Sequence, residues 1–120
     1  NGDWNGKIMN KRLLLSKPIR TENKEVEWFY EMGNIIITYP KKFGKIESWI
    51  KSIIGGSEEI RRPLDKFTTF IWENCDGNKN LGEIINEFDK KFGEEVAPAD
   101  IRVQKFLENL LQLNLITLIA

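Results

Sequence analysis

The stretch from Leu64 to Leu118 constrains the fold most, because three short amphipathic segments follow one another there with clear breaks between them. The breaks are the pair Asp76-Gly77 and the motif G-x-x-V-x-P at residues 93–98. Glycine accepts the left-handed conformation in which many helices end, and proline fits the first turn of a helix. These signals predict three consecutive helices that are closed by a short apolar run.

Each predicted helix has a start signal and an apolar stripe. Asp65 can cap the first helix, Asn80 and Glu83 resemble a capping box for the second, and Pro98 begins the third. The run 115–119 predicts a further strand. The stripes at helical spacing are Phe67, Phe70, Ile71 and Asn74, then Leu81, Ile84, Ile85, Phe88 and Phe92, then Val103, Phe106, Leu107, Leu110 and Leu111.

The residues before Leu64 predict a small antiparallel sheet. Residues 26–32 are rich in aromatics and residues 35–39 in β-branched side chains, so the turn signal Gly33-Asn34 between them indicates a hairpin. Residues 58–64 predict a third strand, at a sheet edge because Pro63 lacks an amide hydrogen. Three strands followed by a three-helix bundle predict an α+β fold, winged helix-turn-helix-like in its order.

Two segments lie outside this pattern. Residues 1–25 are expected to form an N-terminal arm, partly extended, which leaves residues 26–120 as a single domain. Inside that domain, residues 41–56 predict a helical insertion that packs on the sheet. Its apolar stripe is Phe43, Ile46, Ile50 and Ile53, and its basic face is Lys41, Lys42, Lys45 and Lys51. The basic face keeps open an alternative function, a module that docks a protein or a membrane.

The composition argues against catalysis and against a bound metal or cofactor. The 120 residues include no histidine, the side chain that most often supplies acid–base chemistry and metal ligands. No His/Cys cluster has metal-ligand spacing, and no glycine-rich phosphate loop occurs. The one cysteine, Cys75, is expected in the core or at its boundary. We therefore expect a protein that is not an enzyme and needs no cofactor.

The charge distribution argues against binding to nucleic acid. Residues 1–64 carry 12 Lys and Arg against 8 Asp and Glu, whereas residues 65–120 carry 6 against 10. In the third predicted helix, Arg102 and Lys105 are balanced by Asp100 and Glu108. A DNA-reading helix needs several cations to neutralise phosphates. A winged-helix nucleic-acid-binding regulator therefore stays as the lesser alternative.

The cellular setting follows from two further observations. No apolar run approaches the ~20 residues that span a bilayer, so no membrane partner is expected apart from the basic-face alternative. Because there is only one cysteine, no disulfide can form within the chain, which fits a reducing compartment. We expect a cytoplasmic protein.

Several residues of the helical half carry a resemblance to a known family. The pattern L-[DN]-x-x-x-x-x-I-W is followed by the D-G turn, an E-I pair and an F-L-x-x-L segment. The residues that match are Leu64, Asp65, Ile71, Trp72, Glu83, Ile84, Phe106, Leu107 and Leu110. Their order resembles PqqD, the D protein of pyrroloquinoline quinone biosynthesis, and the recognition domains of ribosomal peptide modification systems. The resemblance implies a chaperone that holds the leader of a precursor peptide and presents it to a modifying enzyme.

The resemblance also implies where the leader binds. In such domains the leader adds as an extra strand to the edge of the small sheet, and its side chains drop between that strand and the third helix. Transferred to this sequence, the edge strand is Glu59, Ile60, Arg61 and Arg62, and the helix wall is Ile101, Arg102, Lys105, Phe106 and Asn109.

Arg61, Arg102 and Lys105 would suit an acidic leader, while Ile101 and Phe106 would form an apolar slot. The alternative interpretation is core packing for Phe106 and a solvated face for the arginines. By analogy with the family, the partner enzyme is expected to be a radical S-adenosylmethionine (SAM) enzyme. Short sheets with open edges pair or swap easily, so a homodimer is one expected state.

Overall fold

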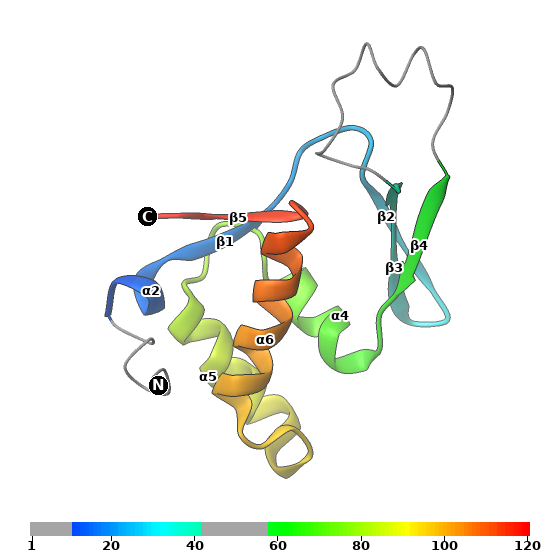
Figure 1. Cartoon of the computed structure of the whole chain (residues 1–120). Helices are drawn as coiled ribbons and strands as arrows, with labels where there is room; N and C mark the ends of the chain where they lie inside the picture. The colour runs from blue at the N-terminus through cyan, green and yellow to red at the C-terminus, as the bar shows by residue number, and fades with distance from the viewer. Residues whose placement is uncertain (1–10, 42–57) are drawn as a thin grey trace.

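The computed structural model describes residues 11–41 and 58–120, so the helical insertion predicted at 41–56 lies outside the described residues except for Lys41. The described elements are α2 (Lys11–Leu15), β1 (Lys17–Arg20), β2 (Glu27–Glu31), β3 (Asn34–Pro40), β4 (Glu59–Pro63), α4 (Lys66–Glu73), α5 (Leu81–Phe92), η1 (Gly93–Val96), α6 (Ala99–Gln112) and β5 (Ile116–Ile119). A three-stranded antiparallel sheet stands beside the helices, so the fold is α+β as predicted (Figure 1).

The three-stranded sheet has the order β2-β3-β4, with β3 in the centre. The predicted hairpin of β2 and β3 is confirmed, but the expected turn at Gly33-Asn34 is wrong by one residue. Asn34 pairs with Glu31, which leaves Met32 and Gly33 as the two loop residues. Both have positive φ, 54° and 88°, as the tight turn between twisted strands requires. Gly33 supplies this conformation without strain.

Side chains alternate between two faces of this sheet. Trp28, Tyr30, Ile35, Ile37, Tyr39, Ile60 and Arg62 make up the helix face, and Glu27, Phe29, Glu31, Ile36, Thr38 and Arg61 make up the outer face. The helix face packs on α4, where the Trp28 and Trp72 rings meet edge to face at 6.1 Å. Close by, the backbone N–H of Ile35 donates to the Thr69 hydroxyl at 3.0 Å. Ile35 and Ile37 are fully buried at this junction.

The three predicted helices are present, and the caps predicted for α4 and α5 are confirmed. Two other signals are displaced: α4 ends at Glu73, before Asp76-Gly77, and α6 begins at Ala99, one residue after Pro98. Asp65 and Thr68 form a capping box on α4, and Asn80 and Glu83 form one on α5. Gly93 ends α5 with a positive φ of 58°. The predicted stripes face the core with one marked exception: Leu111 of α6 is 36% exposed. No helix among the described residues is both long and apolar enough to span a bilayer.

Cys75 lies in the core, as predicted. It is fully buried, and its thiol donates to the Ile71 carbonyl at 3.3 Å. Burial raises the pKa of the Cys75 thiol to about 12, because the thiolate would lose its hydration; the Arg20 charge lowers that pKa to a smaller extent. The residue is therefore a neutral packing side chain and not a nucleophile.

A second, two-stranded sheet joins the two ends of the described chain. The strand predicted at residues 115–119 is confirmed as β5, and it pairs antiparallel with β1. The other side of β1 faces the loop between α4 and α5, where Arg20 N–H donates to the Cys75 carbonyl and Gly77 N–H to the Pro18 carbonyl, both at 2.9 Å. A Cβ on Gly77 would lie 3.0 Å from the Ile19 side chain. Gly77 also has a positive φ of 83°, a conformation that other residues rarely adopt, so glycine suits this position.

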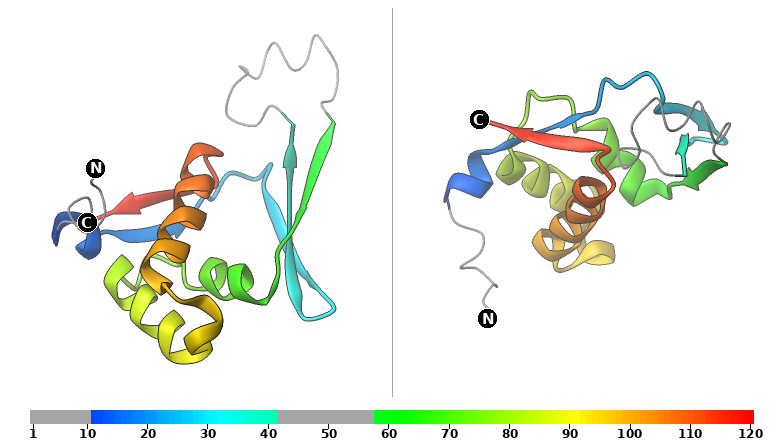
Figure 2. Two further views of the ribbon diagram at one scale, coloured as in Figure 1. Left: turned by 60° about the horizontal axis from the view of Figure 1, so that its bottom comes forward. Right: turned by 45° about the horizontal axis from the view of Figure 1, so that its top comes forward.

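The N-terminal arm is thus only partly extended, and its first described turn is the helix α2. Its strand β1 lies against the helical unit, as two further views show (Figure 2). The predicted boundary between arm and domain at residue 25 stays a prediction.

Candidate peptide-binding site

The strand β4 has the open edge that strand addition requires. Among the described residues, β4 pairs only with β3. Leu64 N–H donates to the Ile35 carbonyl at 2.8 Å. In an antiparallel pair every second residue bonds to the neighbouring strand, so Leu64, Arg62 and Ile60 bond to β3. The alternation leaves the backbone groups of Glu59 and Arg61 pointing to the open edge. Pro63 occupies the next outward position, where its missing N–H removes no bond from the sheet.

The two arginines of β4 lie on opposite faces of the sheet. Arg62 is half-buried on the helix face, where its Nε donates to the Tyr39 hydroxyl at 3.3 Å. Arg61 lies on the outer face, where it forms an ion pair with Glu31 at 2.8 Å and covers the Phe29 ring at 5.5 Å. Arg62 therefore shares the face that packs on the helices, whereas Arg61 can reach an added strand only from the outer face.

A pocket of about 490 Å³ opens close to the end of β4, where the chain turns into α4. It brings together four of the five residues expected on the helix wall. Its lining consists of Asp65, Phe67, Thr68, Ile71, Phe88, Arg102, Lys105, Phe106 and Asn109. Phe106 is half-buried, and besides lining this pocket it packs against the core. No residue of β4 lines this pocket, although Asp65 follows β4 by two positions.

The electrostatics of this pocket favour an anionic ligand. Arg102 and Lys105 are exposed, and the described residues give neither of them an ion pair. The one carboxylate present, Asp65, accepts bonds from the Thr68 N–H at 2.9 Å and the Thr68 hydroxyl at 2.8 Å. Burial alone would raise the pKa of Asp65, but these hydrogen bonds outweigh it and hold the pKa below its ordinary value. The two cations therefore remain available.

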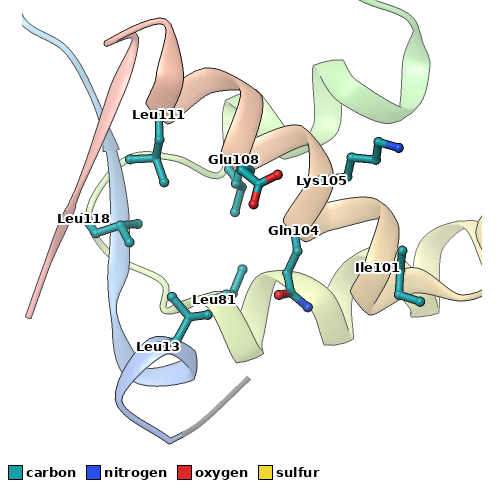
Figure 3. Close-up of a pocket in the computed structure, with 9 residues that line it drawn as sticks. Leu13, Leu81, Ile101, Gln104, Lys105, Glu108, Leu111 and Leu118 are labelled. Carbon is teal, nitrogen blue, oxygen red and sulfur yellow. The ribbon is translucent and has the colours of Figure 1, made fainter. Parts of the chain in front are cut away.

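The fifth expected wall residue, Ile101, lies elsewhere. It is 55% exposed and lines a second pocket of about 450 Å³ between α6, α2, α5 and β5. In Figure 3, Leu13, Leu81 and Leu118 lie across this pocket from the α6 side chains, and the Lys105 ammonium points away from it. The structure does not bring Ile101 and Phe106 together in one slot.

Sequence reasoning missed the α4 side of the first pocket. Asp65 was expected only as a helix cap, and Phe67 and Phe88 only as core. The sequence does hold one signal for Thr68: it stands three positions after Asp65, the spacing of a capping box. In the part of the chain that the structure describes, no group of three or more His, Cys, Asp or Glu side chains could hold a metal ion.

The family model described as coenzyme PQQ synthesis protein D (PqqD) matches residues 63–116. No curated protein and no solved structure matches the chain. The matched segment runs from the last residue of β4 to the first residue of β5, so it contains all three helices of the pocket. The family predicted from the sequence is confirmed over this segment.

Proposed function

We propose that this chain, whose residues 63–116 belong to the PqqD family, is a non-catalytic chaperone for a ribosomally made precursor peptide. It captures the leader of the precursor by strand addition to β4 and presents it to a modifying enzyme. One observation carries the proposal. The edge of β4 that is open among the described residues ends close to a pocket with two cations, which form no ion pair with any described residue.

Recognition would divide between backbone and side chains. The N–H and C=O groups of Glu59 and Arg61 would pair with the leader backbone, which gives affinity that tolerates many sequences. Leader side chains on the helix face would lie near Ile60 and Arg62. Beyond Pro63 the leader would reach the pocket, where acidic side chains meet Arg102 and Lys105 and an apolar one meets Phe106. Charge on the pocket would then select acidic leaders.

The family supports a precursor peptide and a modifying enzyme as the kinds of partner. We further propose that the enzyme is a radical SAM enzyme and that the complex forms in the cytoplasm. The nucleic-acid alternative gains nothing from the geometry, because α6 presents Arg102 and Lys105 beside Asp100 and Glu108. Docking through the basic face at residues 41–54 falls outside the described residues except for Lys41, which forms an ion pair with Glu58.

The test is a titration of isotope-labelled protein with leader segments of small peptides encoded beside its gene. We expect saturable amide shifts at Glu59 and Arg61 and from Arg102 to Phe106. The double variant Arg102→Glu with Lys105→Glu should bind an acidic leader about tenfold more weakly, because two attractions become repulsions. A matched control, Lys24→Glu with Lys90→Glu, makes the same change in net charge at exposed positions away from the pocket.

Two results would count against this function. If the pocket variant and the control bind a cognate leader equally, the pocket is not the leader site. If none of the neighbouring peptides binds, the chaperone function is wrong, and the docking and nucleic-acid alternatives return.

A further inference from the structure

The strand β2 is the second open edge of the three-stranded sheet. Within residues 11–41 and 58–120, β2 pairs only with β3. It carries three consecutive aromatic residues that stay exposed, Trp28 at 38%, Phe29 at 40% and Tyr30 at 54%. A free strand edge with large apolar side chains is a template for pairing with another chain. Nothing in the leader-binding proposal uses this edge.

The register shows which backbone groups of β2 are free. Glu31 and Asn34 flank the two-residue loop, so they exchange both of their hydrogen bonds. The alternation then turns the backbone groups of Phe29 and Glu27 inward to β3. The N–H and C=O groups of Trp28 and Tyr30 therefore point to the open edge, where an added strand would meet them.

The helix-face side chains of this edge are already held in place. The Trp28 ring lies against Trp72, and the Arg20 guanidinium covers it at 5.1 Å. Arg20 is itself fixed by donating to the Trp72 carbonyl at 2.8 Å. The Tyr30 hydroxyl donates to the Glu73 carboxylate, which raises the pKa of Tyr30. A strand that adds here meets a preorganised edge, so little ordering opposes its binding.

The negative charges on the outer face of β2 favour a partner strand that carries cations. Glu27 and Glu31 flank Phe29 there, four residues apart. Glu31 already pairs with Arg61, whereas the described residues give Glu27 no ion pair. A second copy pairing antiparallel about Phe29 would set Glu27 opposite Glu31, and like charges directly opposite destabilise a sheet. The second copy is therefore disfavoured in this register.

We propose that the β2 edge docks an extended segment of a partner protein that carries two cations four residues apart with an apolar residue between them. The cations meet Glu27 and Glu31, and the apolar residue meets Phe29. The positions between them meet Trp28 and Tyr30 and carry apolar side chains. This inference is independent of the leader site, because it concerns the other edge of the sheet.

The probe is the blocked peptide RVYVR, titrated into labelled protein. We expect saturable amide shifts at Trp28 and Tyr30, with none at Glu59 and Arg61. N-methylation of both valines should abolish binding, because these residues face the open groups of β2. N-methylation of the central tyrosine should leave binding intact. The charge-reversed peptide EVYVE should bind at least about tenfold more weakly.

A charge swap identifies the register. The substitution Glu27→Lys should weaken RVYVR about fivefold and should favour RVYVE, whose last residue faces position 27 in an antiparallel pair. Equal binding of RVYVR and EVYVE would overturn the proposal, as would shifts confined to β4. Shifts at Trp28 and Tyr30 on dilution of the protein alone would also overturn it, since they would show a second copy as the occupant. A leader can still bind β4 in each of these cases, so the two proposals fail separately.

Discussion

The two outer strands of the sheet, β4 and β2, share β3 as a neighbour but differ in charge and surroundings. β4 carries Arg61 and Arg62 and leads into a pocket with two more cations. β2 carries Glu27 and Glu31 around exposed aromatic side chains. Backbone groups alone would accept any extended chain at either edge. The comparison shows how side chains can give two edges of one small sheet different occupants.

The first and largest effect tests whether both edges belong to one stable folded unit. With a pKa of about 12 instead of 9.0, the Cys75 thiol should hold about a thousandfold less thiolate near pH 8. We expect almost no reaction with a thiol reagent until urea unfolds the chain. A peptide saturating either edge should leave this protection unchanged. If the Cys75 thiol reacted faster with peptide bound, binding would open the fold. The two edges could then not be compared as preformed sites.

The second effect concerns β3, the strand that pairs with both edge strands. Ile37→Ala removes a fully buried side chain from β3 and should lower the free energy of unfolding by about 3 kcal/mol. Urea denaturation followed by circular dichroism measures this loss. The control Met32→Ala changes a side chain that is 98% exposed and should stay within about 0.5 kcal/mol. A loss of peptide binding at one edge only would show that the edges do not depend on β3 equally.

The third effect is specific to β4, because α4 begins directly after it. Asp65→Ala removes the cap of α4 and should cost about 1 kcal/mol at neutral pH. Since the folded pKa of Asp65 is lowered, this contribution is complete above the ordinary aspartate pKa and is lost as pH falls through the folded value. The difference between wild type and variant should therefore shrink in acid. The affinity of the β2 edge for RVYVR should stay unchanged.

The control for this prediction is Asn80→Ala, which removes the matching cap of α5. An amide does not titrate, so its cost should not follow the same acid profile. If the Asp65→Ala difference were equally large at all pH values, the carboxylate would not be the stabilising group.

The smallest effect concerns the ion pair between Arg61 and Glu31, which alone links the two edges among the described residues. Arg61→Ala removes the exposed pair with Glu31, which should cost about 0.5 kcal/mol or less. The freed Glu31 carboxylate should strengthen RVYVR binding about twofold by the same estimate. Lys41→Ala is the control, because it breaks the exposed pair with Glu58 without touching β2. Equal affinities in the two variants would mean that Glu31 takes no part in docking.

Local signals predicted most of the fold. Capping residues and glycines act within one turn of chain, so Asn80, Glu83 and Gly93 could be assigned from the sequence. The hairpin loop was misplaced because Met32 at positive φ has no sequence signature. The pairing of β1 with β5 could not be predicted, since no local pattern reveals a partner about a hundred residues away.

Local spacing along α6 also predicted part of the candidate site, whereas non-local packing decided the rest. Helical spacing puts Arg102, Lys105, Phe106 and Asn109 on one face of α6, and the structure gathers all four in one pocket. Ile101 precedes Arg102 by one residue, which turns it about 100° around the helix. Its surroundings depend on where α2 and β5 pack. Because these contacts are non-local, the sequence could not show which pocket Ile101 lines.

The position of β1 between β5 and the Cys75–Gly77 loop has a consequence for how the protein is made. Lys17 lies opposite Ile119, so the two strands of this pair leave the ribosome about a hundred residues apart. The helices α4 and α5 can form their local contacts earlier, because nearby segments close short loops at low entropic cost. β1 can complete its pairing only after β5 emerges. The emergence of β5 therefore decides when the nascent chain closes its second sheet.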